Sequence, residues 1–150
     1  MTPEQVLAKV PQQAPFRFLD SIIELSDTHI IGEYTFKEDE FFYKGHFPGD
    51  PVTPGVILTE AMAQTGVVAL GLYLLSLTVD EAELSAWTTF FTECEMEFNL
   101  PVLPGETVKI SGEKVYFRRM KLKSKVRLYL ANGDLAAEGT VAGVGVKRGS

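Results

Sequence analysis

The chain has 150 residues, of which 45% are hydrophobic and 23% charged, a balance typical of a globular protein. This length favours a single domain over residues 1–150. The formal net charge of −6 argues against non-specific binding to nucleic acids or anionic membranes. Cys94 is the one cysteine, so no intrachain disulfide can form, which fits a reducing compartment. The first ten residues lack an apolar signal-peptide core, and we therefore expect a cytoplasmic protein.

The first predicted elements are a short helix and a hairpin. Thr2 is a suitable N-cap and Pro3 suits the first helical turn. The prolines within residues 11–15 are expected to end this helix. Extended structure is predicted for residues 16–25 and again for residues 30–36. A Ser-Asp-Thr turn signal separates the two segments, so they should pair as a hairpin.

A long apolar helix is predicted over residues 53–76, with Thr53 as its N-cap and Pro54 at its first position. Its apolar run is long enough to span a bilayer. However, Glu60 and Gln64 lie within it, and an ionisable side chain at that depth in lipid is costly. A helix that is apolar on all sides can also be buried within a protein, and this is our interpretation.

Beyond this helix the hydrophobic period changes to two. From Leu84 to Phe98 we predict one long strand with a mostly buried face, formed by Ala86, Thr88, Phe90, Thr92, Cys94, Met96 and Phe98. Three further strands are predicted at residues 107–117, 120–130 and 135–146, the last two joined by an Asn-Gly hairpin turn.

These elements predict an α+β fold in which a curved antiparallel sheet, a meander of long strands, surrounds one apolar helix. A helix without a polar side needs more cover than a single sheet provides. A second copy of the chain would supply that cover, so we expect at least a dimer.

Titratable residues stand out in the stretch Gly45–Gln64. His46 lies in a loop rich in Gly and Pro, and an imidazole is the usual general base near neutral pH. Glu60 lies in the apolar helix, where burial would raise its pKa and suit it to act as a general acid or to activate water. Either residue could instead be structural: Glu60 at the edge of a polar pocket, His46 as an inert loop side chain.

The start of the helix adds a third element. The backbone N–H groups of Gly55 and Val56 have no intrahelical acceptor and lie at the positive end of the helix dipole, where a developing oxyanion would be stabilised. A base, an acid and an oxyanion site in one short stretch indicate proton abstraction next to a carbonyl, with loss or addition of a group at the next carbon. The sequence offers neither a Cys/His metal cluster nor a Gly-rich phosphate loop after a strand, nor a Gly-x-Ser-x-Gly motif.

The central stretch resembles the β-hydroxyacyl-acyl-carrier-protein dehydratases of the FabZ type. The resemblance rests on Gly45-His46-Phe47-Pro48-Gly49-x-Pro51-Val52-x-Pro54-Gly55-Val56 with Glu60-Ala61-Met62-Ala63-Gln64. It extends to Pro15-Phe16-x-Phe18-Leu19-Asp20 and to Pro101-Val102-Leu103-Pro104-Gly105-Glu106. It implies a hotdog fold, a long helix wrapped by an antiparallel sheet. It also implies a homodimer, or a trimer of such dimers, in which each active site combines the histidine of one protomer with the carboxylate of the other.

The resemblance also implies roles for single residues. His46 would remove the C2 proton of a 3-hydroxyacyl thioester, and Glu60 would assist departure of the C3 hydroxyl. The N–H of Gly55, with that of Val56, would bind the thioester carbonyl, and Gln64 would position Glu60 or a water. No cofactor or metal is expected. Glu at position 60, where FabA-type dehydratase–isomerases carry Asp, favours plain dehydration.

Substrate and pathway stay open at this point. Thr53 stands where many family members have an apolar residue, often Met, and Thr59 adds a hydroxyl beside Glu60. Housekeeping fatty-acid synthesis and specialised pathways, such as those of aryl-polyene pigments or unusual lipids, both fit. A hotdog thioesterase and a non-catalytic acyl-binding protein are the alternative functions, since a fold does not fix function.

The expected partner is an acyl carrier protein bearing the substrate. Basic residues form a comb on an otherwise acidic chain, and it could dock an acidic carrier: Arg118, Arg119, Lys121, Lys123, Lys125 and Arg127. The alternative is that these side chains are the ordinary solvated face of a half-buried strand.

Overall fold

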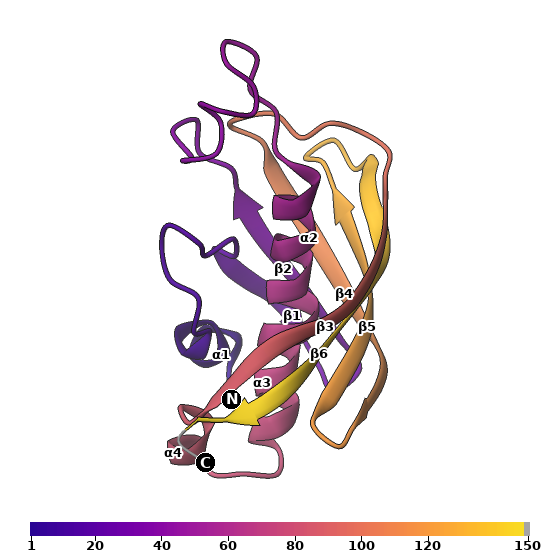
Figure 1. The fold of residues 1–150 in the computed structure, drawn as a ribbon. Helices are drawn as coiled ribbons and strands as arrows, with labels where there is room; N and C mark the ends of the chain where they lie inside the picture. Colours follow the sequence, from indigo (N-terminus) through magenta and orange to yellow (C-terminus); the bar gives the residue numbers. More distant parts are fainter. Residues whose placement is uncertain (149–150) are drawn as a thin grey trace.

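In the computed structural model, which describes residues 1–148, a six-stranded antiparallel sheet wraps one long helix (Figure 1). The strands are ordered β1-β2-β4-β5-β6-β3 across the sheet. The predicted α+β hotdog fold is therefore confirmed.

The N-terminal helix α1 (Pro3–Lys9) begins and ends as predicted. The Thr2 hydroxyl accepts a hydrogen bond from the Gln5 N–H, and the Gln5 side chain accepts one from the Thr2 N–H, which forms a capping box. At the other end, the guanidinium of Arg17 donates to the carbonyls of Leu7 and Val10. Both ends of α1 are thus capped by side chains.

Strands β1 (Ser21–Leu25) and β2 (His29–Thr35) form the predicted antiparallel hairpin. Only the second half of the segment predicted as extended is a strand. The first half runs alongside the long helix, where Gln64 bonds its backbone.

The long helix consists of α2 (Gly55–Ala63), the π-helical segment η1 (Gln64–Ala69) and α3 (Leu70–Ser76). By length and composition alone it could cross a membrane, yet 72% of its most apolar window is buried within the fold, as befits a core helix. Two details differ from expectation. The N-cap is Pro54, because the Thr53 hydroxyl bonds the Tyr43 hydroxyl at 2.7 Å and does not cap the helix. The π-helical turn has no signal in the sequence.

The helix approaches the sheet closely at Gly66. A Cβ placed there would lie 2.6 Å from Cγ1 of Val126, and a Cβ on Gly112 of β4 would lie 2.8 Å from the Cα of Gly66. The buried Ser124 hydroxyl donates to the Gly66 carbonyl at 2.6 Å. Only glycine allows this contact between helix and sheet, which lies in the π-helical segment.

The remaining strands are β3 (Trp87–Phe98), β4 (Thr107–Arg118), β5 (Lys121–Tyr129) and β6 (Leu135–Lys147). A short helix, α4 (Glu81–Leu84), replaces the predicted beginning of the first of them. The predicted meander is confirmed for β4, β5 and β6. It was wrong for the first of the four strands, because β3 pairs with β6 and not with β4.

The predicted buried face of β3 was also wrong for a single chain. β3 is an edge strand, and Phe90, Phe91 and Phe98 are 58%, 44% and 49% exposed, while Cys94 is exposed as well. A bulge between Phe91 and Glu93 also shifts the alternation. In Figure 1 β3 crosses the long helix, but residues 90–95 of this strand stay exposed, so the described chain leaves most of this edge uncovered.

The Gly66 contact yields a stability prediction. Gly66→Ala should lower the free energy of unfolding by about 1–3 kcal/mol, because its Cβ would overlap Val126. Gly71→Ala is the matched control in the same helix, since its Cβ would meet only Leu122 Cδ2 at 3.6 Å. It should be neutral or stabilise by about 0.5–1 kcal/mol. Urea unfolding at one protein concentration measures both, and equal effects would contradict the close approach.

Candidate active site

His46 belongs to the loop between β2 and α2. This loop lies at the end of the molecule where the long helix begins (Figure 1). The Phe47 N–H and Asp50 carbonyl, and the Asp50 N–H and Phe47 carbonyl, are paired by hydrogen bonds of 3.1 and 2.9 Å. Gly49, at φ 75°, allows this tight turn. The Val52 N–H donates to the His46 carbonyl at 3.0 Å. These bonds hold the histidine in a compact hairpin-like loop.

The His46 ring is held by its Nδ1 atom, which lies 2.9 Å from the Val52 carbonyl oxygen. A carbonyl can only accept, so Nδ1 must carry the proton in this bond. In the neutral ring Nε2 then carries the free lone pair. His46 is half-buried, and its ring stacks on Phe47 with centroids 4.2 Å apart. The loop thus presents Nε2 as a base.

Glu60 and Gln64 form a bonded pair one turn apart in the long helix. The Gln64 Nε2 donates to Glu60 Oε2 at 2.8 Å and to the Phe16 carbonyl at 2.8 Å. Its Oε1 accepts from the Phe18 N–H at 2.7 Å. These backbone partners fix which end of the amide faces Glu60. Gln64 is fully buried, so the carboxyl is held by a rigid donor.

The Glu60 carboxyl has a raised pKa. Burial, which disfavours the charged form, raises it, and the hydrogen bond from Gln64 lowers it by less. A raised pKa increases the protonated fraction near neutral pH, which is what a general acid requires. The expectation that burial would perturb Glu60 is met by this arrangement.

The start of the helix carries free donors. Gly55 and Val56 are its first two residues, so their N–H groups have no acceptor within the helix. Val56 is 77% exposed, and the ring of Phe98 covers Gly55, where an added Cβ would lie 3.2 Å from Phe98 Cζ. A ligand atom could reach these donors beside an aromatic side chain.

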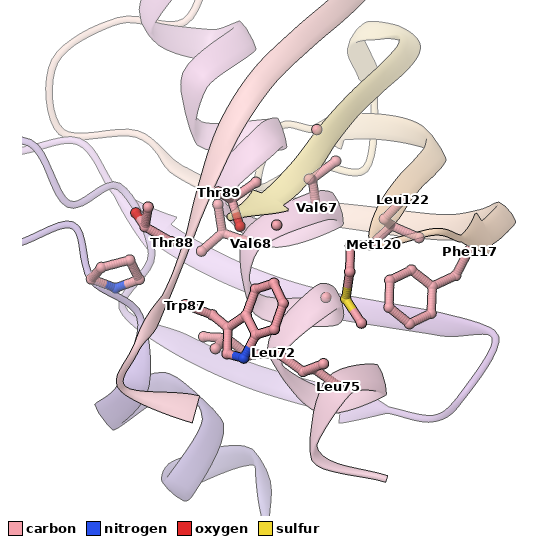
Figure 2. Close-up of a pocket in the computed structure, with 14 residues that line it drawn as sticks. Val67, Val68, Leu72, Leu75, Trp87, Thr88, Thr89, Phe117, Met120 and Leu122 are labelled. Atoms are coloured by element: carbon pink, nitrogen blue, oxygen red, sulfur yellow. The ribbon is translucent and has the colours of Figure 1, made fainter. Parts of the chain in front are cut away.

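Glu60 opens onto a pocket of about 330 Å³, its open mouth included. Most of the other lining residues are apolar: Ala63, Val67, Val68, Phe91 and Ala142, with Gln12 and Thr89 as the polar ones. Val67, Val68 and Thr89 also line a neighbouring pocket of about 460 Å³, its open mouth included. Figure 2 shows side chains of the helix, β3 and the β4–β5 hairpin around this second pocket, among them Leu72, Leu75, Trp87 and Met120. A carboxyl group beside an apolar pocket suits a ligand with a polar reacting end and an apolar tail.

Gln12 is a site residue that the sequence interpretation missed. It lines the Glu60 pocket, and its Oε1 atom is buried without a hydrogen-bond partner in the described chain. No sequence signal could have found it, because a glutamine in a Pro-flanked loop is ordinarily a solvated residue. His46, in contrast, is not among the residues that line this pocket.

The basic comb is partly neutralised. Lys121 and Lys123 both contact Glu93, at 3.3 and 3.2 Å. Arg118 lies over the Tyr116 ring at 4.5 Å. Arg119, at φ 51°, belongs to the turn between the end of β4 at Arg118 and the beginning of β5 at Lys121. Within residues 1–148, no group of three or more His, Cys, Asp or Glu side chains is placed to hold a metal ion.

Solved structures of hotdog proteins share this fold. The dehydratase heterocomplex ApeI:P from Xenorhabdus doucetiae aligns with a TM-score of 0.75 at 18% identity, over 99% of this chain and 93% of that chain. A thioesterase from Haemophilus influenzae aligns with a TM-score of 0.69 at 13% identity, over 100% of this chain and 94% of that chain. At these identities the likeness defines the class, a hotdog-fold protein.

The sequence comparisons define the family. The FabA-like domain matches residues 10–143. The 3-hydroxyacyl-[acyl-carrier-protein] dehydratase FabZ of Acetivibrio thermocellus is 34% identical over 88% of this chain and 86% of its own length. The FabZ of a Roseiflexus species is 33% identical over 93% of this chain and 92% of its own length. The chain belongs to the FabA-like family and, within it, to the FabZ-type dehydratases.

The raised pKa of Glu60 predicts how stability depends on pH. A carboxyl whose folded pKa lies above its unfolded value favours folding below the unfolded pKa. That contribution is lost as pH rises through the folded pKa. Glu60→Gln removes the titration, and its amide can still accept from Gln64. The variant should therefore gain stability relative to the natural protein as the pH rises above about 4.5, the ordinary pKa of a glutamate side chain.

Chemical denaturation from pH 4 to pH 8 measures this difference. Glu97→Gln, an exposed carboxyl on β3, is the matched control and should show no such gain. A difference between Glu60→Gln and the natural protein that falls with rising pH would contradict the raised pKa.

Proposed function

We propose that this protein dehydrates 3-hydroxyacyl thioesters, carried on acyl carrier protein, to trans-2-enoyl thioesters. The observation that carries the proposal is the half-buried Glu60 carboxyl, held by Gln64 beside a pocket lined mostly by apolar residues. Membership of the FabZ-type dehydratases supports this reaction. The free Nε2 of His46 supplies the base that it requires.

The proposed reaction is an elimination. The Nε2 of His46 takes the proton from C2 of the substrate, and the electron pair of the broken C2–H bond forms the C2–C3 double bond. The hydroxyl leaves C3 with a proton from Glu60, so water is the second product. The Gly55 N–H, with that of Val56, stabilises the negative charge on the thioester oxygen. Gln64 keeps the Glu60 carboxyl in place through its backbone bonds.

Two copies of the chain are proposed to form each active site. Each site would join His46 of one protomer with Glu60 of the other, in a homodimer that can assemble further into a hexamer. The open edge of β3, with its exposed Phe residues, supports a partner there. His46 lies outside the Glu60 pocket of its own chain, which is consistent with a histidine supplied by the partner.

Fatty-acid biosynthesis in the cytoplasm is the proposed setting, with specialised polyene or unusual-lipid synthesis as the alternative. Substrate preference decides between them: a carrier-bound panel of saturated acyl chains and aryl-polyenoyl chains should show the highest kcat/KM for a saturated chain. Preference for an aryl-polyenoyl chain would contradict the fatty-acid assignment. Recovery of the protein with the membranes in cell fractionation would contradict the proposed cytoplasmic location.

The dehydratase assay is the direct test of function. Enoyl absorbance should rise when the protein meets a 3-hydroxyacyl thioester, without release of free thiol. His46→Ala and Glu60→Gln should each lower kcat by about 10²- to 10⁴-fold, because each removes an acid–base group. Thiol release without enoyl formation would identify a thioesterase, and neither signal would identify a binder. Full activity in both variants would refute the mechanism.

The same assay tests whether the acyl tail enters the pocket of Figure 2. Leu75 lines that pocket, whereas the neighbouring Leu74 does not, and both side chains are 5% exposed. Leu75→Ala should shift the preference towards longer chains. Leu74→Ala truncates an equally buried side chain outside the pocket and should leave the chain-length preference unchanged. Equal shifts would place the tail elsewhere.

Carrier docking on the basic comb is proposed through Arg118, Arg119 and Lys121. Arg118 and Arg119 are exposed and make no ion pair among the described residues, so their charge is available to an acidic carrier. Lys121 and Lys123 both contact Glu93, so less of the charge of Lys121 is available to the carrier.

Charge reversal tests this docking surface. Arg118→Glu with Arg119→Glu should raise KM about tenfold for carrier-bound substrate and leave it unchanged for a small thioester analogue, because only the carrier is acidic. Lys109→Glu, an exposed charge on β4 outside the comb, is the control. An equal rise in KM for both substrates would refute docking at this site.

A further inference from the structure

The loop that carries His46 is closed at its base by a hydrogen bond between two side chains. The hydroxyl oxygens of Tyr43 and Thr53 lie 2.7 Å apart. The two residues stand on either side of His46 in the sequence, and they are only 5% and 4% exposed. A buried bond therefore closes the part of the loop that contains His46.

The two hydroxyls depend on each other. Within residues 1–148 neither has another hydrogen-bond partner. The Tyr43 ring packs against Phe42, with centroids 4.7 Å apart. Burial raises the pKa of the Tyr43 hydroxyl, so it keeps its proton at neutral pH. If either hydroxyl were lost, the other would stay buried without a partner, which is costly.

Two short paths connect this bond to the proposed catalytic groups. Thr53 directly follows Val52, whose carbonyl holds Nδ1 of His46 and whose N–H donates to the His46 carbonyl. The Thr53 N–H donates to the buried Val102 carbonyl at 2.9 Å, which ties the same point to the turn after β3. In the other direction Thr53 precedes Pro54 and Gly55, where the free helix donors begin.

Resting on the proposed function, we propose that Tyr43 and Thr53 are a positioning pair that fixes the direction of His46 Nε2 and of the Gly55 N–H relative to each other. Neither side chain needs to touch substrate. The pair acts through the backbone of Val52 and through the start of the helix. Small displacements of a base or an oxyanion donor are sufficient to slow a reaction strongly.

The proposal also accounts for an oddity of the sequence. Thr53 was expected to be the N-cap of the long helix, yet its hydroxyl does not cap the helix. In this chain the hydroxyl has a different partner, Tyr43. The polar residue at position 53 is thus explained by the loop that it closes.

Kinetics of four variants test the pair. Thr53→Val and Tyr43→Phe should each lower kcat about tenfold with little change in KM, because the groups are misplaced while the binding pocket is intact. Thr53→Ser keeps the hydroxyl and should stay within about twofold of the natural protein. The double variant Tyr43→Phe/Thr53→Val should be no slower than the slower single variant, because both remove one bond.

A second readout does not depend on activity. The ¹⁵N chemical shifts of His46, assigned by comparison with His46→Ala, report which ring nitrogen carries the proton. The natural protein should show the proton on Nδ1, and Thr53→Val should show a mixture of the two tautomers. Thr107→Val is the matched control, since the hydroxyls of Thr107 and Thr35 lie 2.8 Å apart between β4 and β2, outside the loop. It should change stability but neither kcat nor the His46 shifts.

Three outcomes would overturn the positioning role: kcat and His46 shifts of Thr53→Val equal to those of the natural protein, a loss in Thr53→Ser as large as in Thr53→Val, or the same changes in Thr107→Val. A natural protein that converts no 3-hydroxyacyl thioester would refute the proposed function instead. The His46 spectra would then still decide the positioning role.

Discussion

The constraint on which the site depends is a half-buried carboxyl group on an apolar helix. Glu60 can stay there because Gln64 donates to it, and Gln64 is itself fixed by the backbone at Phe16 and Phe18. A buried polar group is tolerated when its partners are satisfied. Burial raises the pKa of Glu60 at the same time, so the packing that holds the carboxyl also adjusts it for proton transfer.

The sheet curves around one side of the helix and leaves the other side uncovered in a single chain. Gly66 and Gly112 bring helix and sheet into contact, and the π-helical segment that contains Gly66 lines the pocket next to Glu60. π-helical turns are frequent at functional sites. The edge at β3 stays open in a single chain. The fold thus leaves uncovered the side on which the proposed partner subunit would complete the site.

Much of this was predictable from the sequence because it depends on local patterns. The α1 cap at Thr2, the end of the long helix at Ser76 and the Asn132-Gly133 turn follow from residue type and spacing. The pairing of β3 with β6 was not predictable, since strand order depends on contacts between distant segments. The same holds for Gln12, and for Thr53, whose hydroxyl found a tertiary partner in preference to the helix end.

The central claim is that His46 and Glu60 act together across two subunits. Equal amounts of His46→Ala and Glu60→Gln protein, unfolded together and refolded, would form mixed dimers with one intact site and one doubly altered site. Random mixing makes half of the dimers mixed, so activity should return to about a quarter of the natural level. If instead the mixture stays as inactive as either variant alone, while forming dimers of normal size, the two residues do not share a site between subunits.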